Sequence, residues 1–116
     1  MKLSKSLFVV ATLSLMANAA NAGTRYDGTW GFRVQSSIAG NCTASASTVE
    51  IKNGKIKGTL QADGSQFRIF GKVDDNGVIK GKIGPGVATY EGKFSNKRAV
   101  GTWTGRFGCR GKVFVQ

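Results

Sequence analysis

One unit recurs through most of the chain: an apolar residue, a glycine and a second apolar residue, each two positions after the one before. A period of two is that of a β-strand, in which alternate side chains face opposite sides. The shared parity places the apolar residues and the glycines on one face and the intervening residues on the other. The pattern therefore predicts strands with one buried and one solvated face. The five copies are Ile56-Gly58-Leu60, Ile69-Gly71-Val73, Ile79-Gly81-Ile83, Tyr90-Gly92-Phe94 and Ala99-Gly101-Trp103.

Turn-forming pairs such as Asn53-Gly54 and Asn76-Gly77 lie between these copies, and they suit tight turns between antiparallel strands. Similar alternation before and after the repeat brings the count to eight strands. An eight-stranded up-and-down meander closes into a barrel because closure removes exposed strand edges. We therefore predict an all-β fold, an eight-stranded antiparallel meander closed into a small barrel with one disulfide. The expected strands span about 27–35, 47–52, 55–62, 66–74, 78–84, 87–95, 98–106 and 109–115.

Residues 1–22 have the three regions of a secretory signal peptide. Lys2 and Lys5 precede an apolar run from residue 7 to 16, and Ala20-Asn21-Ala22 follows it. The run is shorter than the roughly 20 residues of a membrane-spanning helix, so a retained anchor is the less favoured alternative. We expect cleavage after Ala22, a single barrel domain over residues 23–116, and no transmembrane segment in the mature chain. The product is expected to be exported and soluble, in a periplasm or outside the cell.

The chain has two cysteines and no histidine. In an exported protein Cys42 and Cys109 are expected to form a disulfide; the alternative, two free redox thiols, lacks the Cys-x-x-Cys spacing. The absence of histidine removes the histidine-based catalytic triads and the common zinc sites. We therefore expect no metal and no cofactor.

The charge balance is strongly basic, with 17 Lys and Arg against 6 Asp and Glu and a formal net charge of +11. Seven of the cations fall at outward positions of neighbouring expected strands and are called the basic wall below. Such a wall attracts polyanions through counterion release, and the outward Phe70 and Phe114 offer rings for stacking. The alternative is that these charges only keep the barrel soluble and block edge pairing. The basic wall consists of Lys55, Lys57, Arg68, Lys72, Lys80, Lys82 and Lys93.

The barrel interior is a second candidate site. Eight strands enclose a space that side chains just fill or that holds one small ligand. The expected inward aromatic residues are Trp30, Phe32, Phe94 and Trp103, and with strands this short we expect them to fill it. A small-ligand carrier is the remaining alternative for this interior.

Catalysis has the least support. The only carboxylates are Asp27, Glu50, Asp63, Asp74, Asp75 and Glu91. Most of them fall in expected turns, where Asp commonly bonds its own backbone. We therefore expect that the protein is not an enzyme.

Gly28-Thr29-Trp30 at the start of the first strand resembles the G-x-W signature of the calycin-like barrels, which include lipocalins, avidins and small secreted bacterial metalloprotease inhibitors. The whole pattern, with Gly101-Thr102-Trp103-Thr104-Gly105 and Cys109-Arg110-Gly111, more closely resembles small exported proteins of proteobacteria. The resemblance implies a barrel. In the resembling inhibitors an N-terminal trunk enters the protease; here only residues 23–26 precede the first strand, and the 36–47 loop is an alternative contact.

The sequence thus favours an exported binding module that engages an anionic polymer or surface, whether nucleic acid, glycan or lipid head groups, through the basic wall. The main alternative is a protein-binding or protease-inhibitor-like barrel that acts on a protein partner.

Overall fold

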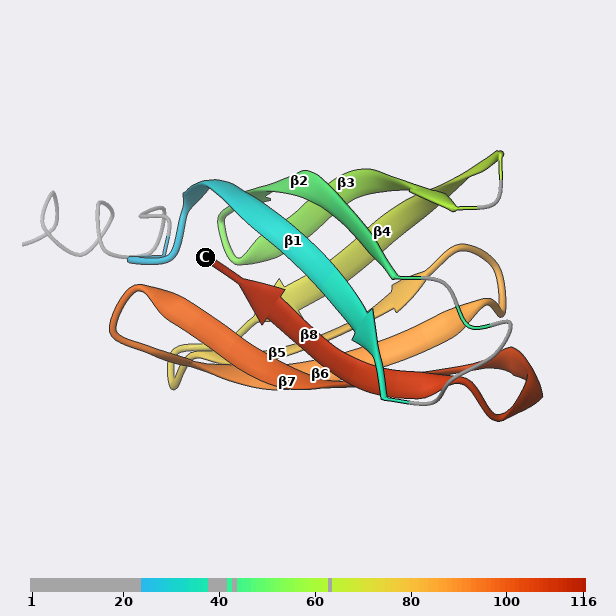
Figure 1. The fold of residues 1–116 in the computed structure, drawn as a ribbon. Coiled ribbons are helices and arrows are strands. Elements are labelled where there is room, and N and C mark those ends of the chain that lie inside the picture. The colour runs from blue at the N-terminus through green and yellow to red at the C-terminus, as the bar shows by residue number, and fades with distance from the viewer. Residues whose placement is uncertain (1–23, 38–41, 43, 63) are drawn as a thin grey trace, which may run out of the picture.

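The computed structural model describes residues 24–37, 42, 44–62 and 64–116; the expected signal peptide lies outside them. Its eight strands form one closed antiparallel barrel in chain order, and β8 pairs with β1 to close it (Figure 1). The predicted fold is therefore confirmed. The elements are β1 (Gly28–Ser36), β2 (Ser45–Lys52), β3 (Lys55–Ala62), β4 (Ser65–Val73), β5 (Val78–Ile83), β6 (Ala88–Ser95), β7 (Arg98–Gly105), the short 3-10 helix η1 (Arg106–Gly108) and β8 (Arg110–Val115).

The strand bounds differ from those expected by at most two residues, and those of β3 are as expected. β2 begins two residues early, at Ser45, and the hydroxyls of Ser45 and Ser47 donate to backbone carbonyls of β3. The expected seventh strand is one residue too long, because Arg106 belongs to η1. There Phe107 and Gly108 take positive φ angles, which a strand does not accommodate.

Alternate residues of every strand fill the barrel. Phe32, Phe94 and Trp103 are buried, as expected of inward aromatic residues, and Trp30 is partly buried against the same core. The described residues contain no buried polar side chain without a hydrogen-bond partner. Burial of this continuous apolar face is the main force that holds a barrel of this kind together.

Gly71 and Gly81 face each other on β4 and β5, and both lie on the inner face. A methyl group added to either one would collide with the hydroxyl group of Tyr90. That hydroxyl donates to the carbonyl oxygen of Phe70 at 2.7 Å, and burial raises its pKa above the ordinary value for tyrosine. At these two inward glycines the side chain of Tyr90 therefore packs directly against the backbone of the barrel wall.

The two ends of the barrel differ. At the end where β1 begins, called the closed end, Tyr26 stacks on Phe94 with ring centroids 4.5 Å apart, and Trp30 meets Phe94 edge-on. The Trp30 indole N–H donates to the Tyr26 carbonyl at 2.7 Å. The carboxylate of Asp27 accepts hydrogen bonds from the backbone N–H groups of Asn53 and Gly54, which fixes the residues before β1 over this end.

The other end is called the mouth and carries the disulfide. Cys42 and Cys109 are bonded, with Cα atoms 5.5 Å apart. The bridge ties the β1–β2 connection to the residue between η1 and β8, as predicted. Within the described residues, no helix has the length and apolar character needed to cross a membrane.

Candidate anion-binding surface

The outer face of β2 to β5 carries a continuous line of lysines. Lys55 of β3 lies opposite Lys52 on one side and Lys72 on the other, and Lys72 in turn lies opposite Lys80. All four are exposed. The lysine row, defined as Lys52, Lys55, Lys72 and Lys80, therefore crosses four neighbouring strands with no other residue type between.

A second row runs beside it and contains an aromatic ring. Phe70 lies opposite Lys57 of β3 and Lys82 of β5. Its ring is 42% exposed, and the guanidinium carbon of Arg68 lies 5.9 Å from the ring centroid. The second row, defined as Lys57, Phe70 and Lys82, thus places an exposed ring among three cations.

Few carboxylates balance these charges. Glu50 lies opposite Lys57, and Glu91 lies opposite Lys80. The remaining described carboxylates, Asp27, Asp74 and Asp75, belong to connections at the closed end. Lys55 and Lys72 therefore have only lysines as directly opposite neighbours.

Like charges directly opposite each other destabilise a sheet by about 0.2–1 kcal/mol per pair. The pairs Lys52–Lys55, Lys55–Lys72 and Lys72–Lys80 all oppose folding in this way. Charged residues on an outer face favour solubility, but solubility does not require like charges in adjacent pairs. The arrangement has an electrostatic cost that an anion at this surface would offset.

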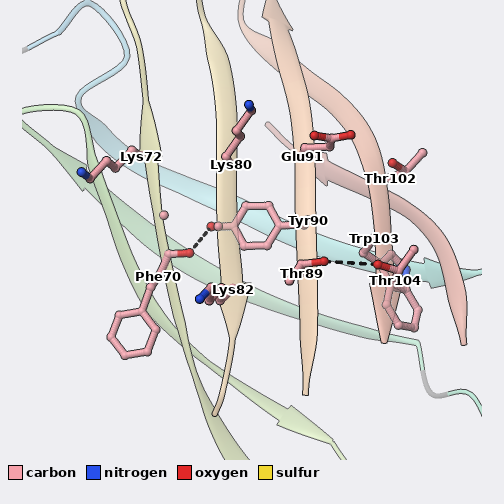
Figure 2. Close-up of a pocket in the computed structure, with 12 residues that line it drawn as sticks. Phe70, Lys72, Lys80, Lys82, Thr89, Tyr90, Glu91, Thr102, Trp103 and Thr104 are labelled. Atoms are coloured by element: carbon pink, nitrogen blue, oxygen red, sulfur yellow. Dashed lines mark hydrogen bonds between the residues drawn. The ribbon is translucent and has the colours of Figure 1, made fainter. Parts of the chain in front are cut away.

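Among the hollows that border Phe70, two lie over the middle of the strands. The larger, about 660 Å³, lies over β4 to β7, with Lys72 and Lys80 on one side and Lys82 on the other (Figure 2). A second of about 640 Å³ lies over β1 to β4 and includes Lys57 and Arg68. Gly71 and Gly81 line the first hollow and add no side chain to it. Glu91 also lines the first hollow, and Glu50 lines the second.

The structure brings six residues of the basic wall together and leaves one at its margin. Lys93 lies on β6 opposite Val78 and Val100, in a row that contains no other lysine. Phe114, expected to be outward beside Lys112, is half-buried, and the guanidinium carbon of Arg33 lies 4.7 Å from its ring centroid. The Phe114 ring therefore already makes a cation–π contact with Arg33 of this chain.

Hollows beside the interior aromatic residues lie at the two ends of the barrel. One of about 300 Å³ lies at the mouth, where Leu60, Phe67, Val87 and Trp103 line it. Another of about 290 Å³ lies at the closed end beside Trp30 and Phe94. The indole N–H of Trp103 is bonded to the carbonyl oxygen of Gln35 at 2.9 Å, so the ring is fixed in place.

Two of the described carboxylates, Asp27 and Asp74, accept hydrogen bonds that hold turns at the closed end. The Thr24 hydroxyl donates to Asp27 at 2.7 Å and holds the pKa of that carboxyl below its ordinary value, with further lowering by backbone N–H groups. Asp74 accepts from the backbone N–H groups of Asn76 and Val78, both at 2.9 Å. In the part of the chain that the structure describes, no three His, Cys, Asp or Glu side chains gather as a metal site would require.

Three features were missed from the sequence. Lys52 extends the lysine row, and the alternation of Glu50, Ile51 and Lys52 contains the signal that would have found it. Tyr26 is buried at the closed end, so it is not available as the tip of a free N-terminal trunk. Phe107 stands almost wholly in solvent, and no periodic pattern marks such a residue.

No protein-family model, curated protein or solved structure matches this chain.

Proposed function

We propose that this protein is an exported binding module that holds a linear polyanion on the basic wall, across the lysine row and the hollows beside Phe70. The observation that supports this most is the lysine row itself, in which Lys55 and Lys72 have only like charges opposite them. A surface that opposes folding in this way is best explained by an oppositely charged partner. Calycin-like ancestry stays a prediction and adds nothing to this argument.

The ligand class follows from the chemistry of the wall. Closely spaced ammonium groups displace the counterions that surround a chain of phosphates or sulfates, and the release of those ions drives binding. Phe70 adds a sequence-tolerant stacking surface, which is used by proteins that bind single-stranded nucleic acids. Within the class of linear polyanions, the ring favours a single-stranded nucleic acid over a sulfated glycan.

The test is the affinity of the oxidised protein for a single-stranded oligonucleotide and for a heparin oligosaccharide across a salt series. For a single strand the logarithm of the affinity falls with that of the salt concentration, with a slope near −0.7 for each phosphate neutralised. Replacement of Lys55, Lys72 and Lys80 by Glu should make the slope shallower by about 2 units.

A matched control separates a site from net charge. Lys97, Arg98 and Lys112 are exposed and lie outside the lysine row, and their replacement by Glu removes the same total charge. We expect this control to retain most of the affinity. If both triple variants weaken binding equally, the wall is only a source of net charge, and a protein partner at the 36–47 loop becomes the better explanation.

Phe70→Ser tests the choice within the class. It leaves every charge in place and removes the ring between Lys57 and Lys82. We expect weaker oligonucleotide binding, with unchanged heparin binding. Equal effects on both ligands would argue against stacking.

A small-ligand role has one observation in its favour, the apolar hollow at the mouth. Trp103 lines that hollow, whereas Trp30 lies at the closed end. In a Trp30→Phe variant, Trp103 emission would report an apolar probe that enters the mouth. Unchanged emission at saturating probe would remove this candidate.

A further inference from the structure

Phe107 is the most exposed of the large apolar side chains in the described residues, at 98%. It is the middle residue of η1, at the mouth, with φ 59° and ψ 32°. A bulky residue seldom adopts this left-handed conformation. Gly108 follows with φ 74°. The Phe107 ring is not part of the core. The left-handed backbone at this position favours glycine or asparagine over phenylalanine.

The tip that carries Phe107 is held on both sides. Arg106 donates from Nε to the Gly86 carbonyl at 2.8 Å and from Nη2 to the Pro85 carbonyl at 3.2 Å. On the other side the chain enters the disulfide at Cys109. Strained residues persist where their surroundings fix them, and they are most common at functional sites. The backbone that carries this exposed ring is therefore held on both sides.

Charge distinguishes the mouth from the closed end. The β1–β2 connection, residues 37–44, contains no charged residue, nor does the β5–β6 connection, residues 84–87. Arg106 and Arg110 flank Phe107, and both are exposed. Asp63, in the β3–β4 connection, lies outside the described residues. The other end carries Asp27, Asp74 and Asp75 together with Arg25 and Lys97, so its connections hold charges of both signs, whereas the described connections at the mouth hold no carboxylate side chain.

We propose that the mouth docks on an anionic lipid surface, where Phe107 enters the interface and Arg106 and Arg110 lie beside the phosphates of the head groups. An exposed aromatic ring with flanking cations suits this boundary, where apolar side chains enter the upper acyl region and basic residues stay with anionic head groups. This site is separate from the basic wall, which lies on the side of the barrel.

Lysines of the basic wall also attract anionic lipid, so the experiment must report which residue enters the bilayer. We would compare Phe107→Trp with Phe70→Trp, which places the same reporter on the basic wall. The vesicles contain equal parts phosphatidylglycerol and phosphatidylcholine, with brominated acyl chains that quench tryptophan. The two native tryptophans give the same background in both variants.

We expect quenching at position 107 and none at position 70. Quenching at position 70 alone would show that the basic wall faces the bilayer. Quenching at neither position would show that Phe107 does not enter the bilayer, and a protein partner would then be the better explanation for its exposure. Either result overturns the proposal.

Phe107→Asn supplies a second readout without a change of charge. Asparagine tolerates left-handed backbone, so this variant should fold and should unfold at a higher temperature than the wild type. Its partition onto the same vesicles should fall about tenfold, which corresponds to the loss of one buried aromatic ring, while oligonucleotide affinity stays unchanged. Unchanged partition would contradict docking through Phe107. Because the basic wall is intact in this variant, failure here leaves the polyanion proposal standing.

Discussion

The Tyr90 hydroxyl, inside the barrel, donates a 2.7 Å hydrogen bond to the carbonyl oxygen of Phe70, whose own ring points outward into the basic wall. The bond passes beside Gly71 and Gly81, where an added methyl group would collide with the hydroxyl. This contact thus links an interior side chain to the backbone of the residue whose ring lies on the outer face. It explains why the two glycines stand in the middle of strands.

Gly71→Ala should destabilise the barrel, because the new methyl group meets the Tyr90 hydroxyl. We expect the free energy of unfolding to fall by about 1–3 kcal/mol, the usual effect of overpacking. In a Tyr90→Phe background the same substitution should cost less, since its nearest obstacle is gone. Chemical denaturation of the four proteins in this double-mutant cycle measures the coupling. Strict additivity would contradict the contact.

The sequence was sufficient to predict this architecture because five of the eight strands, β3 to β7, repeat an apolar–glycine–apolar pattern with constant parity. Glycine in a strand marks a place where the backbone is closely approached, and Gly71 shows such an approach. The sequence did not predict that the approaching group is Tyr90. Tyr90 lies on another strand, and whether its side chain meets Gly71 depends on the register of β4 to β6.

The rest was missed for different physical reasons. Ser45 begins β2 through a side-chain hydrogen bond to β3, which an apolar pattern does not contain. Tyr26 precedes the first strand, and only the closed barrel brings it against Phe94. Phe107 is held by Arg106 and the disulfide, which are contacts made at a distance along the chain. For the basic wall, parity predicted the outward direction, but only the register showed that the lysines lie opposite one another.

Lys72→Gln should stabilise the protein at low salt, because Lys72 lies between Lys55 and Lys80. We expect a gain of about 0.2–1 kcal/mol, measured as a higher unfolding midpoint. The gain should shrink near 1 M salt, where the screening length is about 3 Å. Lys112→Gln is the control, since Lys112 lies opposite Thr102 and Gln35. The account is wrong on this point if both variants respond alike.

Removal of the disulfide should weaken the fold severely. The bond between Cys42 and Cys109 closes a loop with a sequence separation of 67. The chain-entropy treatment then gives about 4 kcal/mol of stabilisation, which is a large share of the total for a small domain. We expect a Cys42→Ser and Cys109→Ser double variant to unfold at a much lower denaturant concentration. An unchanged midpoint would show that the strands alone hold the barrel closed.

Acid should weaken the closed end through Asp27. The Thr24 hydroxyl, with help from backbone N–H groups, holds the pKa of Asp27 below its ordinary value of 3.8. A depressed folded-state pKa stabilises the protein fully above the ordinary value, and that stability is lost as the pH falls through the folded-state value. Asp27→Asn should therefore flatten the fall of the unfolding midpoint in acid. Asp75→Asn, in a turn at the same end, is the control and should retain the wild-type acid response.

The central claim is that a linear polyanion lies across β3 to β5, and the most direct measurement is an amide NMR titration of the ¹⁵N-labelled protein with a single-stranded oligonucleotide. The account predicts progressive shifts for the amides around Lys55, Lys72, Lys80 and Phe70, with those of η1 and β8 unmoved. Shifts confined to the mouth, with β3 to β5 silent at saturation, would contradict it.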